Sequence, residues 1–144
     1  MFKLILTLAV ALITWPVEAD DYRMIPFKEL PQTARELIEN YFSQSEVSYT
    51  TAKRSLLERE YKVYLSDGGT ISFDRNGRWS EIDCGRGELP EEMIPASIRE
   101  ELRKHFPEGR IQEVERTRKG FEVKFRNGPE AEFDRRGRVV KVDD

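Results

Sequence analysis

Cys84 and His105 are the two residues whose chemistry could make this chain an enzyme, because an imidazole can take the proton of a thiol and leave a strong nucleophile. Each is the only residue of its type. His105 falls in the apolar stripe of a predicted helix, and Cys84 ends a predicted strand. Structural roles are therefore favoured for both, and a small thiol-dependent enzyme is kept as a second alternative. A disulfide from Cys84 to another chain also stays open.

Metal and phosphate sites are not expected. One cysteine and one histidine cannot furnish a zinc site within the chain. The run Asp74 to Gly77 resembles the start of a calcium loop, but its glycine comes two positions early and Gly85 stands where the loop needs a glutamate. The glycine pairs at 68–69 and 85–87 lack the spacing of phosphate-binding loops. We therefore predict no catalytic residue, no metal and no cofactor.

The first nineteen residues have the plan of a secretory signal peptide. Lys3 precedes the apolar stretch from Leu4 to Ile13, and Pro16 and the small residue Ala19 close it off. This stretch is about half the roughly twenty residues that a membrane-spanning helix needs. We expect residues 1–19 to be removed on export and residues 20–144 to form the mature domain. The protein is then periplasmic or secreted, with no stable membrane insertion.

The charge pattern bears on the class of partner. The chain has 24 basic and 27 acidic residues, a net charge of −3, and the two signs are interspersed. This composition favours solubility and gives no sign of a basic nucleic-acid patch. Nucleic acid is therefore not an expected partner.

Two stretches have the spacing of an amphipathic helix, in which apolar residues recur every three to four positions. Each begins next to a proline, Pro31 or Pro95, where a missing amide costs little. The first stripe comprises Ala34, Leu37, Ile38, Tyr41 and Phe42, and the second comprises Ile98, Leu102, His105 and Phe106. The sequence thus predicts two similar helices.

After each helix the apolar period changes to two, which is the spacing of a strand with one buried face. Strands are predicted at 61–65, 71–73 and 78–83, and again at 121–125, 131–133 and 138–142. Earlier strands are expected near 47–53 and 111–117. Asp67-Gly68 and Asn127-Gly128 are hairpin signals. Asp74 to Gly77 and Asp134 to Gly137 suit type I turns with a bulge.

These elements predict an α+β fold made of tandem helix-plus-antiparallel-sheet repeats, with the helices packed on one face of the sheet. The two copies span about residues 28–84 and 94–144, and residues 85–93 form the hinge between them. A unit of about fifty residues is marginally stable alone. We therefore expect the two sheets to join or pack into one core.

The two copies resemble the PepSY-like family, whose name reflects similarity to the β-lactamase inhibitor protein. The likeness rests on the proline-started helix, the aromatic-x-Val strand, the Asp-Gly or Asn-Gly turn, the Phe-Asp ending and the following Gly-Arg strand, and it covers about residues 28–144. Members are small exported bacterial proteins. The resemblance implies binding and not catalysis, and it supplies no catalytic residue to carry over.

A candidate binding surface follows from strand alternation. The register that buries Val63 points Tyr64 to the opposite face of the sheet. Trp79 points the same way if Ser80 and Ile82 face the helices. Tyrosine and tryptophan are frequent anchors of protein interfaces, although a shift of one residue would exchange the two faces. The predicted protein-binding surface is Tyr64 and Trp79 with a charged rim that includes Lys62, Glu81 and Lys124.

The leading hypothesis is therefore an exported, non-enzymatic module that binds an unknown protein or peptide and can inhibit an envelope enzyme. The alternative is a structural or chaperone-like envelope stress protein that holds unfolded clients. The thiol-dependent enzyme is the second alternative.

Overall fold

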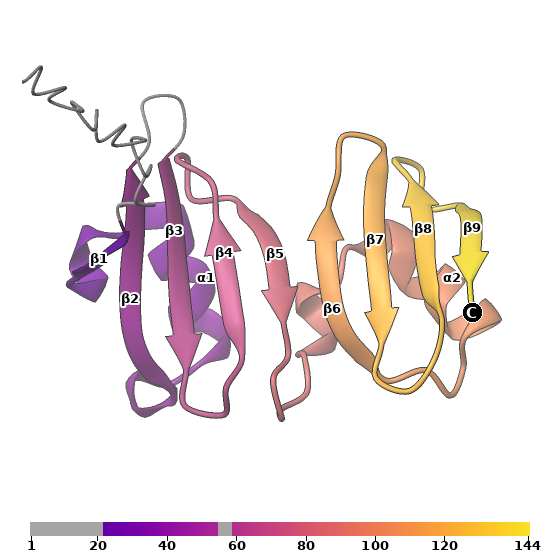
Figure 1. Ribbon diagram of the computed structural model, residues 1–144, viewed down its shortest axis with the longest axis horizontal. Helices are drawn as coiled ribbons and strands as arrows, with labels where there is room; N and C mark the ends of the chain where they lie inside the picture. Colours follow the sequence, from indigo (N-terminus) through magenta and orange to yellow (C-terminus); the bar gives the residue numbers. More distant parts are fainter. Residues whose placement is uncertain (1–21, 55–58) are drawn as a thin grey trace, which may run out of the picture.

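The computed structural model describes residues 22–54 and 59–144, which form nine β-strands and two α-helices with three short 3₁₀-helices. The strands lie in one antiparallel sheet in the order of the sequence, from β1 to β9 (Figure 1). The predicted signal peptide, residues 1–19, lies outside the described residues. The strands are β1 Tyr22–Ile25, β2 Val47–Arg54, β3 Arg59–Leu65, β4 Thr70–Phe73, β5 Trp79–Asp83, β6 Ile111–Arg116, β7 Gly120–Phe125, β8 Glu130–Asp134 and β9 Val139–Asp143.

Helices α1 (Gln32–Tyr41) and α2 (Ala96–His105) lie on the same side of the sheet, behind it in Figure 1. Each follows a proline, as the sequence predicts. Each is followed by a phenylalanine, Phe42 or Phe106, whose amide donates to the carbonyl four residues earlier, and both of these bonds are 2.8 Å long. The shorter 3₁₀-helices are η1 Phe27–Glu29, η2 Gln44–Glu46 and η3 Glu91–Met93. Within the described ranges, no helix is both long and apolar enough to cross a membrane.

One row of paired residues crosses all nine strands on the side of the helices. The row consists of Ile25, Thr50, Val63, Ile71, Ile82, Val114, Val123, Ala131 and Val142. Its central six members, from Val63 to Ala131, are at most 2% exposed. They belong to one hydrophobic cluster with the buried residues of both helices. The prediction that the two halves share one core is therefore confirmed.

The turns before β5 and β9 have the same construction. In the first, the Asp74 carboxylate accepts amide hydrogen bonds from Asn76 (2.9 Å) and Arg78 (3.0 Å). The second, Asp134–Arg138, has equivalent bonds of 2.9 Å. Gly77 and Gly137 have φ values of +82° and +87°, and a register shift lies beside each turn. The predicted turns with bulges are confirmed.

Two features differ from the sequence predictions. Strand β1 was not predicted, and it pairs with β2 from Tyr22 opposite Lys53 to Ile25 opposite Thr50. The segment 85–93 was predicted to act as a hinge, yet it is tied to the second half. The Arg126 guanidinium donates to the carbonyl of Gly85 at 2.8 Å and to that of Gly87. Strands β5 and β6 also pair directly, which makes the sheet continuous.

Candidate functional site

Both α-helices lie on one side of the sheet, and neither covers the opposite face of the described strands (Figure 1). We call this opposite face the outer face. Because side chains alternate along a strand, the residues that flank each member of the buried row point to this face. Its first three strands carry aromatic, apolar and basic side chains, and its last five carry charged ones.

The stacked tyrosines Tyr49 and Tyr64 dominate the first part of the outer face. They are opposite each other on β2 and β3, and their rings are 4.2 Å apart at the centroids and 12° from parallel. Tyr49 is 40% exposed, and Met24 on the neighbouring strand is 72% exposed. The Lys62 ammonium lies 5.6 Å from the centroid of the Tyr64 ring. Tyr64 and Lys62 thus lie together on the outer face, and their role in binding stays a prediction.

Strands β5 to β9 present a strip of carboxylates on the same face. On each strand, the two residues that flank the buried row are both charged. Two of the ten are lysines, Lys124 and Lys141, and eight are acidic. We call these eight residues the acidic strip: Glu81, Asp83, Glu113, Glu115, Glu122, Glu130, Glu132 and Asp143. Acidic and basic residues that are interspersed in the sequence are therefore separated in the fold, where acidic side chains gather on this part of the outer face.

Two carboxyls of the acidic strip, Glu113 and Glu122, have pKa values raised well above the ordinary 4.5. Burial raises the pKa of Glu113 to about 7, and a hydrogen bond shared with Glu81 and the Glu81 charge add to this. A shared hydrogen bond is the main cause that raises the pKa of Glu122 to about 7, here with Glu130. Lys124 opposes both shifts, with its ammonium 3.8 Å from Glu113 and 3.9 Å from Glu130. Two residues of the predicted charged rim therefore both interact with Glu113: Glu81 shares a hydrogen bond with it, and Lys124 forms an ion pair with it.

These shifts predict that stability falls as pH rises. A carboxyl whose pKa exceeds its ordinary 4.5 in the folded chain binds its proton more tightly when folded. Its stabilising contribution is complete below about pH 4.5 and is lost as pH rises through about 7. Because these carboxyls are partly exposed, we expect a loss on the order of 1 kcal/mol for each pair. Urea unfolding at a series of pH values measures it.

Glu113→Gln should remove about half of this pH dependence, because the amide does not titrate while the Glu122 carboxyl still does. Glu100→Gln, on the exposed side of α2, is the matched control and should leave the profile of the parent protein unchanged. A Glu113→Gln profile as steep as that of the parent would contradict the assignment of the proton to this pair.

The predicted position of Trp79 on the outer face is wrong. Trp79 is 5% exposed and lies opposite Phe73, on the side of the helices. The prediction assumed unbroken alternation from Ile82 back through Ser80, by analogy with the valines of β9. The register shift beside the turn inserts one extra residue, so Ile82 and Trp79 both face inward although they are three positions apart.

The two residues with catalytic potential are not arranged as an activated pair. Cys84 is 7% exposed, and burial raises the pKa of its thiol to about 11. His105, the last residue of α2, lies with its Nε2 at 3.0 Å from a carboxylate oxygen of Glu101. A thiol that stays protonated at neutral pH is a poor nucleophile. No group of three or more His, Cys, Asp or Glu side chains in the described ranges is placed to hold a metal ion.

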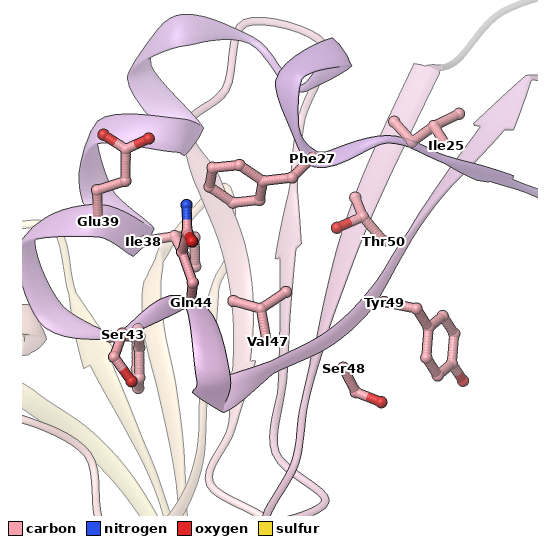
Figure 2. Close-up of a pocket in the computed structure, with 11 residues that line it drawn as sticks. Ile25, Phe27, Ile38, Glu39, Ser43, Gln44, Val47, Ser48, Tyr49 and Thr50 are labelled. Atoms are coloured by element: carbon pink, nitrogen blue, oxygen red, sulfur yellow. The ribbon is translucent and has the colours of Figure 1, made fainter.

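An apolar groove lies beside the sheet edge between α1, η1, η2 and β2, with a volume of about 410 Å³. Figure 2 shows Phe27, Ile38 and Val47 projecting toward one another from three elements, whereas Tyr49 points away from them. The full lining comprises Ile25, Phe27, Ile38, Glu39, Phe42, Ser43, Gln44, Val47, Ser48, Tyr49 and Thr50. Sequence reasoning did not find this groove, because its walls come from five separate elements, β1, η1, α1, η2 and β2.

Comparison with known proteins identifies the family of the chain. Residues 59–141, more than half of the chain, match the family model described as "Putative beta-lactamase-inhibitor-like, PepSY-like". No curated protein sequence gives a significant match.

Solved structures from Bacteroides share the whole fold. A "putative calcium-regulated periplasmic protein" from Bacteroides thetaiotaomicron is 32% identical with a TM-score of 0.81, covering 88% of this chain and 99% of its own. A "putative periplasmic protein of unknown function" from Bacteroides vulgatus is 34% identical with a TM-score of 0.76, covering 85% and 99%. A further "putative periplasmic protein" from Bacteroides vulgatus is 29% identical with a TM-score of 0.81, covering 88% of this chain and 99% of its own.

The descriptions of these three structures agree on the compartment. The chain is periplasmic or secreted, as its sequence predicts. It belongs to the PepSY-like, β-lactamase-inhibitor-like family.

Proposed function

We propose that this PepSY-like protein is a non-enzymatic binding module that docks another protein or a peptide on its outer face. The stacked pair of Tyr49 and Tyr64 carries the proposal, since it places two aromatic rings on a sheet face that neither helix covers. Aromatic anchors supply much of the binding energy in protein interfaces. Stacking holds both rings in place before binding, which lowers the entropy that a partner must overcome.

The negative charge of the acidic strip favours a partner that has a basic surface. Its eight carboxylates face only Lys124 and Lys141 among the charged residues that flank the buried row on β5 to β9. Lysine and arginine side chains of a partner would be attracted to this surface and oriented by it. The partner is therefore expected to carry an apolar or aromatic spot, for the tyrosine pair, next to a basic patch. When that partner is an envelope enzyme, docking near its active site would inhibit it.

The state of Cys84 bears on the thiol-dependent alternative. Its burial and raised pKa oppose the thiol-dependent alternative, because a protonated thiol does not attack substrates. Cys84→Ser should therefore leave every measured activity of the protein unchanged.

We also infer that residues 28–84 and 94–144 are two copies of one unit within a mature domain of residues 20–144, after a signal peptide of residues 1–19. The order of one α-helix followed by four strands occurs twice in the described chain, which supports this inference. In both halves the turn glycine before the last strand lies against the start of the α-helix, Gly77 against α1 and Gly137 against α2. N-terminal sequencing of the exported protein tests the cleavage site.

Affinity capture from envelope extract tests the binding proposal. We expect the tagged protein to retain a partner that the double variant Tyr49→Ala and Tyr64→Ala loses, because truncating an anchor typically costs about 2 kcal/mol or more. Tyr41→Ala is the matched control, since Tyr41 is 37% exposed but lies on α1, on the other side of the sheet. Trp79 is left intact because its substitution would disturb the core.

The charge of the partner is tested on the captured complex. Replacing Glu115, Glu122 and Glu132 with glutamine should weaken the complex, and added salt should weaken it further. Because one similar protein is described as calcium-regulated, capture is repeated in calcium chloride and in EDTA. A complex that the tyrosine variant and the glutamine variant retain as fully as the parent protein would exclude the outer face as the docking surface.

The apolar groove favours a second candidate, a chaperone-like role. With a volume of about 410 Å³ and walls that include Phe27 and Val47, the groove could hold apolar side chains of unfolded clients. Suppression of client aggregation that is lost in Val47→Asp, and kept in the double tyrosine variant, would favour this role over docking on the outer face.

A further inference from the structure

An open cavity of about 590 Å³ lies at the end of the sheet where the turns before β5, β7 and β9 meet. Its walls include Asp74, Arg78, Trp79, Arg116, Arg118 and Arg135. The volume lies within the range typical of small-molecule sites. The cavity is separate from the tyrosine pair and the acidic strip, because Trp79 faces the helix side of the sheet.

Arg116 occupies an unusual position in this cavity. The carbon at the centre of its guanidinium lies 4.1 Å from the centroid of the Trp79 ring and 5.7 Å from that of Phe121. Its Nε is buried and has no hydrogen-bond partner among the described residues. Burial lowers the pKa of Arg116, and the charge of Arg78 lowers it further. A buried donor without a partner costs free energy that an oxyanion in the cavity would recover.

The rim of the cavity adds positive charge. Arg78, Arg118 and Arg135 are exposed, so four arginines of the lining stand against one carboxylate, that of Asp74. The Asp74 carboxylate already accepts two amide hydrogen bonds within its own turn. The Arg135 Nε donates to the Arg118 carbonyl at 2.9 Å, which ties two of the turns together. This region is therefore strongly positive in a chain whose net charge is −3.

We propose that this cavity binds a small organic anion, in which a carboxylate or phosphate group pairs with the arginines and a flat apolar body rests against Phe121 and the Arg116 guanidinium that covers Trp79. Arginine suits both parts of such a ligand, because it pairs with oxyanions through several N–H groups and also stacks on rings. The two aromatic rings are 6.3 Å apart at their centroids and form one wall with the Arg116 guanidinium. The site is independent of the binding proposed for the outer face.

Titration with three probes tests this site: phenyl phosphate, benzoate and the neutral benzyl alcohol. Trp79 is the only tryptophan of residues 20–144, and a Trp15→Phe background makes it the only one where residues 1–19 are retained, so its fluorescence reports on the cavity. Calorimetry measures affinity in parallel. We expect at least one of the two anions to bind and change the Trp79 emission, while benzyl alcohol has no effect. Binding of phenyl phosphate alone, of benzoate alone or of both assigns the site to phosphate, to carboxylate or to oxyanions in general.

Arginine variants show whether the cavity itself is responsible. Arg116→Gln should lower the affinity for the anion by at least about tenfold, as expected for the loss of a charged hydrogen bond. Added salt should lower this affinity further. Because Arg116 packs on the core, Arg78→Gln and Arg118→Gln on the exposed rim serve as variants that leave folding intact, each with an expected loss of roughly threefold or more. Arg23→Gln, on the distant strand β1, is the matched control and should bind as the parent does.

Two results would overturn the proposal. One is the absence of any heat or change in Trp79 emission with either anion at millimolar concentrations. The other is an affinity that the rim variants leave unchanged, or that Arg23→Gln reduces as much as they do. Thermal unfolding followed by circular dichroism is measured on every variant to show that it is folded.

Discussion

Phe73→Ala is expected to lower the free energy of unfolding by about 3–5 kcal/mol, the typical cost of truncating a buried phenylalanine. Phe73 is 0% exposed and lies on β4 between Tyr61 and Trp79 in the register of the sheet. Its removal leaves a cavity that these paired neighbours cannot close without leaving the sheet. The loss is a large part of the roughly 5–15 kcal/mol that stabilises a domain of this size. Urea unfolding followed by circular dichroism measures it.

The same experiment tests whether the two halves form one cooperative core. NMR amide signals of Val63 in the first half and Val123 in the second should disappear at the same urea concentration, both in the parent and in Phe73→Ala. Val140→Ala is the control, since Val140 is 60% exposed and its truncation should change stability by less than about 0.5 kcal/mol. Separate transitions for the two halves would contradict the single core.

Gly137→Ala is expected to cost on the order of 3 kcal/mol, through two effects that act together. Gly137 has a φ of +87°, which L-residues with a side chain rarely adopt. In addition, a Cβ at this position would lie 2.0 Å from the carbonyl oxygen of Ser97 in the first turn of α2. This steric overlap can be relieved only if α2 moves away from the sheet. Thermal and urea unfolding of the variant measure the loss.

Gly128→Ala is the matched control for this substitution. The nearest atom to an added Cβ there is the Phe125 Cβ, at an ordinary contact distance of 3.8 Å. Its stability should stay within about 0.5 kcal/mol of the parent. If both variants lost the same free energy of unfolding, the loss would reflect the general flexibility of glycine and not the contact of Gly137 with α2.

The helices, the eight strands from β2 to β9 and the turns between them could be predicted from the sequence, because each has a local signature. The stripes after Pro31 and Pro95 have the period of a helix, and the alternation around Val63 and Val123 has the period of a strand. Strand β1 has no such signature, since only Ile25 of its four residues is buried. Its pairing with β2 depends on contacts between segments that are far apart in the sequence, and the local pattern of residues does not encode such contacts.

The candidate site was less predictable for the same physical reason. Tyr64 follows directly from alternation within its own strand, whereas Trp79 is separated from Ile82 by a bulge that reverses the face. The tyrosine pair needs the register between two strands, and the arginine cavity needs three turns that are far apart in the sequence. The acidic strip was hidden because alternation separates neighbouring charges onto different faces, so a mixed sequence can fold into segregated surfaces.

The order of the strands in the sheet also bears on how an exported chain reaches its folded state. Every strand from β1 to β9 pairs with the strand that comes next in the sequence, and no strand crosses over another. Contacts between sequence neighbours form with a small loss of chain entropy. A chain that emerges from a translocation channel with its N-terminus first can therefore add each new strand to the edge already formed. If the chain is exported unfolded, as its predicted signal peptide implies, unpaired edges are then exposed only briefly, and this order of assembly limits aggregation.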